Sequence, residues 1–307
     1  MSKIDLSVDL NGLKLKNPIT VASGTFGFGR EFEDYLDLNS LGGIMVKGLT
    51  LKERKGNPVP RVAETPMGML NSVGLQNPGV EYFIKNELPF LKQYDTKVIA
   101  NINGNTIEEY CEIADILSKT SVDSLELNIS CPNVKEGGVS FGRDPEMVYK
   151  VTKKVREYAD KHLIVKLSPN VTDIKEVAAA AEKGGADCLS LINTLIGMSI
   201  DIDREVTILA RGMGGLSGPA IKPVAVRMVY EVFNSVSIPI IGMGGIMNER
   251  DAIEFLLAGA TAISIGTGNL INPTISMEVL EGIEKHLEKK GYKSIEEIKG
   301  RVKVPSK

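Results

Sequence analysis

Short apolar stretches recur along the chain, and each of them ends in small or polar residues. Within most stretches the residues are apolar almost throughout, rather than alternating between apolar and polar. This pattern is typical of parallel strands that are covered on both faces. Eight stretches have this character: Ile19–Ala22, Gly43–Lys47, Val98–Asn101, Ser124–Ile129, Leu163–Leu167, Cys188–Asn193, Pro239–Ile241 and Ala262–Ile265.

Segments with helical periodicity lie between these predicted strands. Several begin with a residue typical of a helix start, such as Asp144 before Pro145, and several end at a glycine, such as Gly259. The clearest helices are predicted over Thr106–Lys119, Pro145–Lys161, Asp173–Lys183, Pro219–Asn234 and Glu249–Ala258. Strands and helices that alternate eight times predict an α/β protein, a (β/α)8 TIM barrel that forms one domain over residues 1–307. An open doubly wound sheet shares this alternation, but the strand count favours the barrel.

Two connections are longer than the rest. Thr50–Gly79 is rich in proline, glycine and asparagine, and Asn193–Gly218 is rich in glycine. Both follow a predicted strand, so we expect inserted loops at the carboxyl-terminal face of the barrel. Enzymes of this fold hold their active sites at that face.

Composition excludes several kinds of function. The 307 residues include 36 Lys and Arg against 39 Asp and Glu, and this net charge of −3 argues against a general binder of nucleic acid or anionic membranes. Three cysteines and two histidines exclude a disulfide framework and a multi-histidine metal centre, so we expect no metal. The sequence shows neither a signal segment nor a run of about twenty apolar residues, so we expect a cytoplasmic protein.

Asparagine and lysine recur where the predicted strands end, at Lys47, Asn101, Asn128, Lys166 and Asn193. Amides and ammonium groups at the mouth of a barrel can bind a planar polar ring through paired donors and acceptors. No carboxylate occurs at these positions. We therefore disfavour a hydrolase with paired carboxylates, and also a magnesium site.

Glycines follow the last two predicted strands, in Gly242–Gly245 and Gly266–Gly268. Their backbone N–H groups can approach an anion, and the ends of these two strands are the common phosphate site of the fold. The alternative is that the glycines only allow tight turns with positive φ. Neither segment has the spacing of a dinucleotide-binding fingerprint.

Cys131 leaves a predicted strand for a glycine-rich loop, where a thiol could act as a nucleophile or base on a mobile lid. The alternative is a small buried apolar residue, which is our interpretation of Cys111 and Cys188. Lys47 and Lys166 end apolar strands, where a lysine is costly unless it is paired or functional. Each could form a Schiff base, face a bound anion or reduced cofactor, or simply reach solvent.

Together these residues resemble the family of dihydroorotate dehydrogenases, and within it most closely the class 1B, NAD-linked branch. The similarity runs in order from about residue 5 to residue 290. The matching segments are Asn17-Pro18, Ala22–Gly29, Lys47–Thr50, Gly56–Pro58, Pro60–Thr65, Asn71–Gly79, Asn128–Asn133 and Gly242–Ile246.

The resemblance implies a barrel that binds FMN noncovalently and oxidises (S)-dihydroorotate to orotate in pyrimidine (UMP) biosynthesis. Cys131 matches the catalytic base, Lys47 would stabilise charge that develops on the substrate, and the loop Pro132–Gly142 would close over it. The phosphate positions are Gly244, Gly245, Gly266 and Thr267. The other flavin positions are Ser23, Lys47, Gly48, Asn101, Asn128, Lys166, Ile192 and Gly218. The pyrimidine positions are Lys47, Asn71, Ser72, Val73, Gly74, Leu75, Asn128, Asn193 and Thr194.

The resemblance also implies partners. Class 1B chains pass electrons to NAD through a second subunit that carries FAD and a [2Fe–2S] cluster, in a heterotetramer built on a homodimer of the catalytic chain. The segments Thr25–Arg30 and Val62–Met69 look like this class. A cysteine rather than a serine base, and no N-terminal extension, separate the chain from the membrane-linked class.

Four alternatives stay open from the sequence. They are a fumarate-using class 1A enzyme, a flavoprotein related to dihydropyrimidine dehydrogenase, a lyase that forms a Schiff base on Lys47 or Lys166, and a non-catalytic flavin-binding or scaffold protein.

Overall fold

Eight parallel strands close into a barrel in the computed structural model, which describes residues 4–129, 135–136, 139–140 and 142–305. Each strand pairs with the next barrel strand along the chain, and the last pairs with the first, where Ile263 lies opposite Ile19. The predicted (β/α)8 barrel is confirmed. The barrel strands are β3 (Ile19–Val21), β4 (Gly43–Met45), β7 (Lys97–Ile102), β8 (Ser124–Asn128), β11 (His162–Lys166), β12 (Cys188–Leu191), β17 (Ile240–Met243) and β18 (Ala262–Ile265).

All eight predicted strands are therefore present, with ends that differ by at most two residues. The predicted strand Gly43–Lys47 ends at Met45, and the predicted strand Cys188–Asn193 ends at Leu191. The barrel strands are buried along almost their whole length, which explains their continuous apolar pattern. Cys111 and Cys188 are buried, as predicted.

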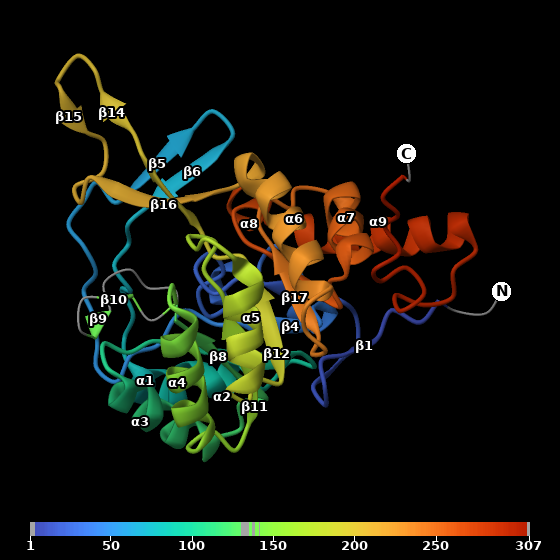
Figure 1. The fold of residues 1–307 in the computed structure, drawn as a ribbon, viewed down its shortest axis with the longest axis horizontal. Helices are drawn as coiled ribbons and strands as arrows, with labels where there is room; N and C mark the ends of the chain where they lie inside the picture. The colour runs from blue at the N-terminus through green and yellow to red at the C-terminus, as the bar shows by residue number, and fades with distance from the viewer. Residues whose placement is uncertain (1–3, 130–134, 137–138, 141, 306–307) are drawn as a thin grey trace.

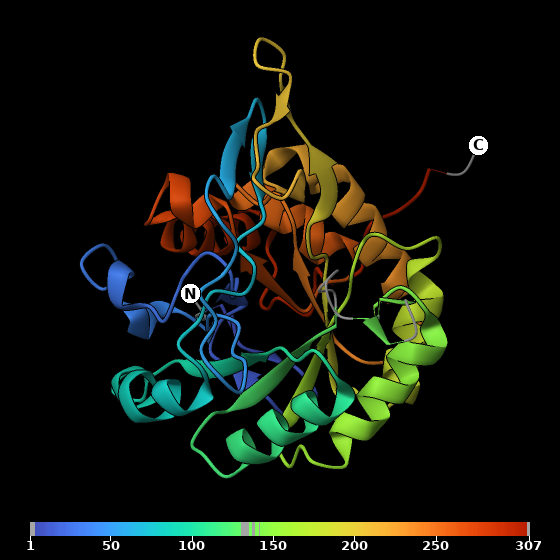
Figure 2. The same ribbon diagram turned by 90° about the vertical axis from the view of Figure 1, so that its left-hand side faces the viewer.

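Helices surround the barrel strands (Figure 2). The five predicted helices are present, although the one predicted over Pro145–Lys161 ends at Arg156. The side chains of Asp144 and Asp173 cap two of them by accepting a hydrogen bond from a first-turn N–H group. The long helices are α3 (Ile107–Ser118), α4 (Pro145–Arg156), α5 (Ile174–Lys183), α6 (Lys222–Phe233), α7 (Glu249–Ala258) and α9 (Ile275–Lys290).

Shorter helical segments fill some connections. They are η1 (Arg30–Phe32), η2 (Leu38–Ser40), α1 (Val80–Tyr82), η3 (Phe83–Glu87), α2 (Leu88–Leu91), η4 (Pro219–Ile221) and α8 (Gly268–Ile271). The described part of the chain has no helix that is both long and apolar enough to cross a membrane.

The two long connections contain strands that the sequence analysis did not predict. β5 (Val62–Thr65), β6 (Gly68–Asn71), β13 (Leu195–Met198) and β16 (Met213–Ser217) form an antiparallel sheet in the order β13-β16-β6-β5. This sheet joins the two connections, since Leu216 of the second pairs with Leu70 of the first. It projects from the barrel together with the hairpin of β14 (Ile200–Asp201) and β15 (Val206–Thr207) (Figure 1). In the loop after β8, β9 (Lys135–Glu136) pairs with β10 (Val139–Ser140).

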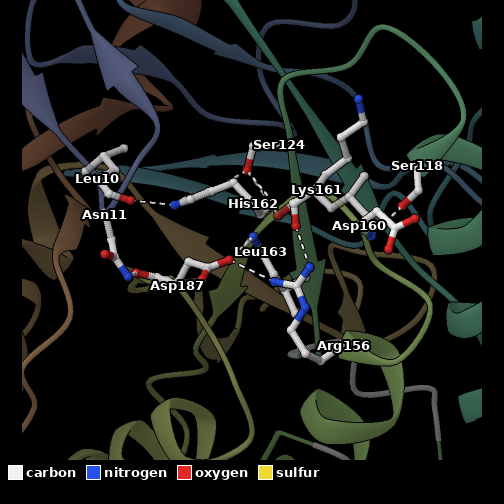
Figure 3. Close-up of polar contacts among 11 residues, drawn as sticks. Leu10, Asn11, Ser118, Ser124, Arg156, Asp160, Lys161, His162, Leu163 and Asp187 are labelled. Carbon is white, nitrogen blue, oxygen red and sulfur yellow. Dashed lines mark hydrogen bonds and ion pairs between the residues drawn. The ribbon is translucent and has the colours of Figure 1, made fainter.

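A hairpin of β1 (Val8–Asp9) and β2 (Lys14–Leu15) packs at the opposite, amino-terminal end of the barrel strands. Figure 3 shows its contact with the first residue of β11, where the ring Nε2 of His162 meets the carbonyl oxygen of Leu10. The carbonyl can only accept, so Nε2 carries the proton and Nδ1 of the neutral ring faces the Ser124 hydroxyl, 2.9 Å away.

Charged groups of both signs lie near His162 and act on its pKa in opposite directions. Arg156 forms an ion pair with Asp187, its nitrogen 2.8 Å from the carboxylate, and Asp187 also accepts a hydrogen bond from the N–H of Leu163 (Figure 3). Burial lowers the pKa of His162, and Arg156 lowers it further, whereas the bond to Leu10, Asp187 and Asp9 raise it. The folded protein therefore favours the neutral ring more than the unfolded chain does.

This difference predicts a pH-dependent stability. Below the unfolded pKa of 6.5 the unfolded chain binds a proton that the folded protein resists, so stability falls as pH falls. We expect the wild type to lose more unfolding free energy between about pH 7.5 and about pH 5.5 than His162→Gln, which keeps an N–H donor but does not titrate. Urea unfolding at each pH measures the unfolding free energy of both proteins. His286 titrates in both proteins, so its contribution cancels in the comparison. Equal losses of unfolding free energy in the wild type and in His162→Gln would contradict the prediction.

Candidate active site

A cavity of about 860 Å³ lies at the carboxyl ends of the barrel strands. Every barrel strand contributes a lining residue at or just beyond its end. In chain order these are Ser23, Lys47, Asn101, Asn128, Lys166, Ile192, Gly244 and Gly266. The small antiparallel sheet adds residues such as Met69, Asn71 and Met213, so it forms part of the wall.

The cavity brings together every described residue that the family resemblance assigns to the flavin or to the pyrimidine. Besides the eight strand-end residues, the set comprises Gly48, Asn71, Ser72, Val73, Gly74, Leu75, Asn193, Thr194, Gly218, Gly245 and Thr267. Cys131 lies outside the described residues. The loop Pro132–Gly142 is described only in part, so its predicted closure stays a prediction.

The described lining is strongly asymmetric in charge. It contains five cationic side chains, Lys47, Arg54, Arg143, Lys166 and Arg211, and no aspartate or glutamate. A partly enclosed space lined by one sign of charge attracts ligands of the opposite sign. The cavity is therefore suited to anionic ligands.

Lys47 lies two residues beyond the end of β4, and its backbone N–H donates to the carbonyl of Gly27 at 2.8 Å. The side chain is half-buried and has no carboxylate partner within the described part of the chain. Burial lowers the pKa of Lys47, and the nearby Arg61 guanidinium lowers it further. An anionic ligand in the cavity would supply the missing counter-charge.

The glycines after β17 leave bare backbone along the cavity. Gly244 and Gly245 have φ of +128° and +80°, a backbone conformation that favours glycine. A Cβ on Gly245 would lie 2.8 Å from the carbonyl oxygen of Gly218, too close for any side chain. A Cβ on Gly266, after β18, would meet no atom nearer than 3.6 Å and would instead occupy cavity space. These positions leave room for a ligand group against the backbone.

A buried asparagine that the sequence analysis missed shapes the loop Asn71–Leu75. The Asn77 amide donates to the carbonyl of Leu75 at 2.7 Å and accepts from the N–H of Gly79 at 2.9 Å. Leu75 has a φ of +57°, an uncommon conformation for leucine, and the bond from Asn77 holds it there. Asn57 fixes the same loop by donating to the carbonyl of Ser72 at 2.8 Å.

Asn170 supports the neighbouring segment, Asn193–Thr194. Its amide donates to the carbonyl of Thr194 at 2.9 Å, and the N–H of Thr194 donates to the Asn193 side chain at 2.9 Å. Asn170 and Ser168 also line the cavity. The sequence offered a signal for Ser168, which follows a predicted strand, but none for Asn170.

A carboxylate lies directly behind the lining, where the sequence analysis did not place one. Glu126, in the middle of β8, is completely buried. It accepts a hydrogen bond from the Asn101 amide and another from the Ser190 hydroxyl at 2.7 Å, and it lies 3.8 Å from the Lys166 ammonium group. An acidic residue between two leucines of a buried strand was the signal for it. The described residues contain no cluster of three or more His, Cys, Asp or Glu that could hold a metal ion.

Comparison with known proteins agrees with this architecture. A family model described as dihydroorotate dehydrogenase matches residues 5–287, and the chain belongs to this family. A protein of Alkaliphilus metalliredigens is 59% identical over 300 residues, which cover 98% of this chain and 99% of the relative. Proteins of Caldicellulosiruptor bescii and Geotalea uraniireducens are 59% and 55% identical over 301 residues, with 98% of this chain covered and 100% and 99% of the relatives. All three carry the name dihydroorotate dehydrogenase B (NAD(+)), catalytic subunit.

Proposed function

We propose that this chain binds FMN and oxidises (S)-dihydroorotate to orotate in pyrimidine biosynthesis, as the catalytic subunit of an NAD-linked enzyme. The family match and the names of the relatives support the reaction and favour the NAD-linked class over the fumarate-using one. The observation that carries the proposal in the structure is the cavity itself, which is lined by cations and free of carboxylates among its described residues.

The cavity fits FMN in size and chemistry. Its volume of about 860 Å³ lies within the range of about 300–1,000 Å³ that small-molecule and cofactor sites occupy. Gly244, Gly245, Gly266 and Thr267 would hold the phosphate against bare backbone. Ser23, Lys47, Gly48, Asn101, Asn128, Lys166, Ile192 and Gly218 would hold the rest of the cofactor. Bound FMN would accept a hydride, that is, two electrons and a proton, from the substrate.

The chain's own side chains would prepare the substrate. Lys47 would pair with an anionic substrate and stabilise the negative charge that develops on it. Asn71–Leu75, Asn128 and Asn193–Thr194 would orient the pyrimidine through complementary hydrogen bonds. Cys131 would remove the proton from the carbon beside a substrate carbonyl, and the loop Pro132–Gly142 would exclude water.

The assembly is also part of the proposal. We place the chain in the cytoplasm as one FMN-binding domain, and as a homodimer within a heterotetramer whose other subunit carries FAD and a [2Fe–2S] cluster. Exposed apolar side chains on the projecting sheet and hairpin, such as Met198, Ile200 and Ile202, support a contact with another chain.

An anaerobic visible spectrum tests the reaction. The purified chain should show the absorbance of oxidised FMN, and (S)-dihydroorotate should bleach it. Cys131→Ala should keep the cofactor but bleach at least about 100-fold more slowly, because a general base contributes about 10²–10⁴ to a rate. Cys111→Ala, which removes a buried thiol remote from the strand ends, should bleach like the wild type. A colourless chain, or flavin that dihydroorotate leaves oxidised, would exclude the proposed function.

The lowered pKa of Lys47 predicts how binding of the product responds to pH. Only the protonated amine attracts an anion, so affinity for orotate should fall as pH rises through the Lys47 pKa, which lies below 10.5. Lys47→Arg, which stays charged, should show no such fall, and Lys47→Met should bind about tenfold more weakly at neutral pH. The spectral change of bound FMN during an orotate titration measures all three. A pH-independent affinity of the wild type would remove Lys47 from the binding site.

The proposed division of labour predicts a requirement for the partner subunit. The isolated chain should be reduced by dihydroorotate yet should form NADH at a negligible rate. Adding the FAD and [2Fe–2S] subunit should restore NADH formation, which absorbance at 340 nm follows. Rapid NADH formation by this chain alone would contradict the NAD-linked assembly proposed here.

A further inference from the structure

We infer that Glu126 is a positioning residue that fixes the direction of the amides beneath the cavity and balances the charge of Lys166. This inference rests on the proposed function, because it concerns the cofactor that Asn101, Asn128 and Lys166 would contact. It assigns a role to a side chain that reaches neither substrate nor cofactor, since Glu126 is completely buried and does not line the cavity.

Each hydrogen bond or ion pair of the Glu126 carboxylate within the described part of the chain is with a hydrogen-bond donor. One oxygen accepts from the Ser190 hydroxyl at 2.7 Å, and the other accepts from the Asn101 amide and faces the Lys166 ammonium group at 3.8 Å. An ionised carboxylate only accepts hydrogen bonds, so this set of partners matches its charged form. A buried carboxylate persists only when it is paired and hydrogen-bonded in this way.

Glu126 also ends a chain of three asparagines. The Asn128 amide donates to the side-chain oxygen of Asn103 at 2.9 Å, and the Asn103 amide donates to the side-chain oxygen of Asn101 at 2.8 Å. The Asn101 amide then donates to Glu126. All three amides therefore point their donors toward the carboxylate.

The common direction of the three amides follows from the chemistry of Glu126. A carboxamide can turn over and exchange its donor and acceptor ends at little cost if its neighbours permit it. The acceptor-only carboxylate forbids that exchange at Asn101, and the constraint passes to Asn103 and Asn128. Because Asn101 and Asn128 line the cavity, Glu126 influences which ends of their amides are turned toward a bound ring.

The second effect is electrostatic, and it distinguishes the two lysines of the cavity. Lys166 is 5% exposed and has Glu126 beside it, whereas Lys47 has no such partner among the described residues. Glu126 thus reduces the positive field that Lys166 exerts on a bound cofactor. Reduced flavin can carry a negative charge, so this field influences how readily the bound cofactor accepts electrons.

Glu126→Gln tests the inference because it preserves shape and removes the charge. With Lys166 no longer balanced, FMN reduction becomes more favourable. We expect the equilibrium constant for reduction to rise about tenfold, which for a two-electron couple raises the midpoint potential by about 30 mV. Titration with a chemical reductant against a reference dye measures this potential. An unchanged or lower potential would overturn the inference, even if the variant were less stable.

Two controls separate this role from a merely structural one. Ser190→Ala removes a hydrogen bond from Glu126 but keeps its charge, so it should lower the unfolding temperature and leave the potential unchanged. In a Lys166→Met background, Glu126→Gln should shift the potential far less than in the wild type. An equal shift would show that Glu126 does not act through Lys166.

A second variant covers a failure of Glu126→Gln to fold. Glu126→Asp keeps the charge but draws it back by one methylene, so it should raise the potential in the same direction by a smaller amount, and no rise would overturn the inference. The chemical titration uses no dihydroorotate. Its result for Glu126 is therefore independent of whether dihydroorotate proves to be the substrate, which the bleaching experiment decides separately.

Discussion

Closure of the barrel is the constraint on which the site depends. Parallel strands in a closed barrel all point the same way, so the residues that follow them must meet at one rim. Pairing of β18 with β3 completes the ring and brings Gly266 into the same cavity as Ser23. A set of residues scattered over the chain thereby becomes one binding surface. No single segment contains the site, and none could form it alone.

Charge within that rim is arranged in two ways. Lys166 is balanced inside the protein by Glu126, whereas Lys47 is left without a carboxylate partner among the described residues. The first arrangement makes a permanent part of the structure, because both groups are buried and mutually satisfied. The second arrangement leaves the Lys47 ammonium group partly buried without a counter-charge, and the free-energy cost of that burial is offset when an anion binds. A cavity with both arrangements has one fixed charge pair and one cation that is available to an anionic ligand.

Much of this could be predicted from the sequence, and the misses have physical causes. Buried parallel strands are largely apolar, so all eight could be located, but apolar residues such as Val46 and Ile192 continue the pattern after the backbone has left the sheet. The small sheet escaped prediction because its strands are short, rich in glycine and paired between distant segments. Family resemblance supplied the cavity residues. Glu126 was missed because its partners come from other strands, Asn101 from β7, Lys166 from β11 and Ser190 from β12, and only a structure reveals them.

The way the small sheet is built has a consequence for biosynthesis. Leu70 pairs with Leu216, and the barrel itself closes only through β18, near the end of the chain. Contacts between such distant segments form slowly and late. During translation the ribosome must therefore release the chain as far as β18 before the binding chamber exists. Any ligand of the chamber can bind only after this point, and until then the barrel strands present unpaired edges that favour aggregation.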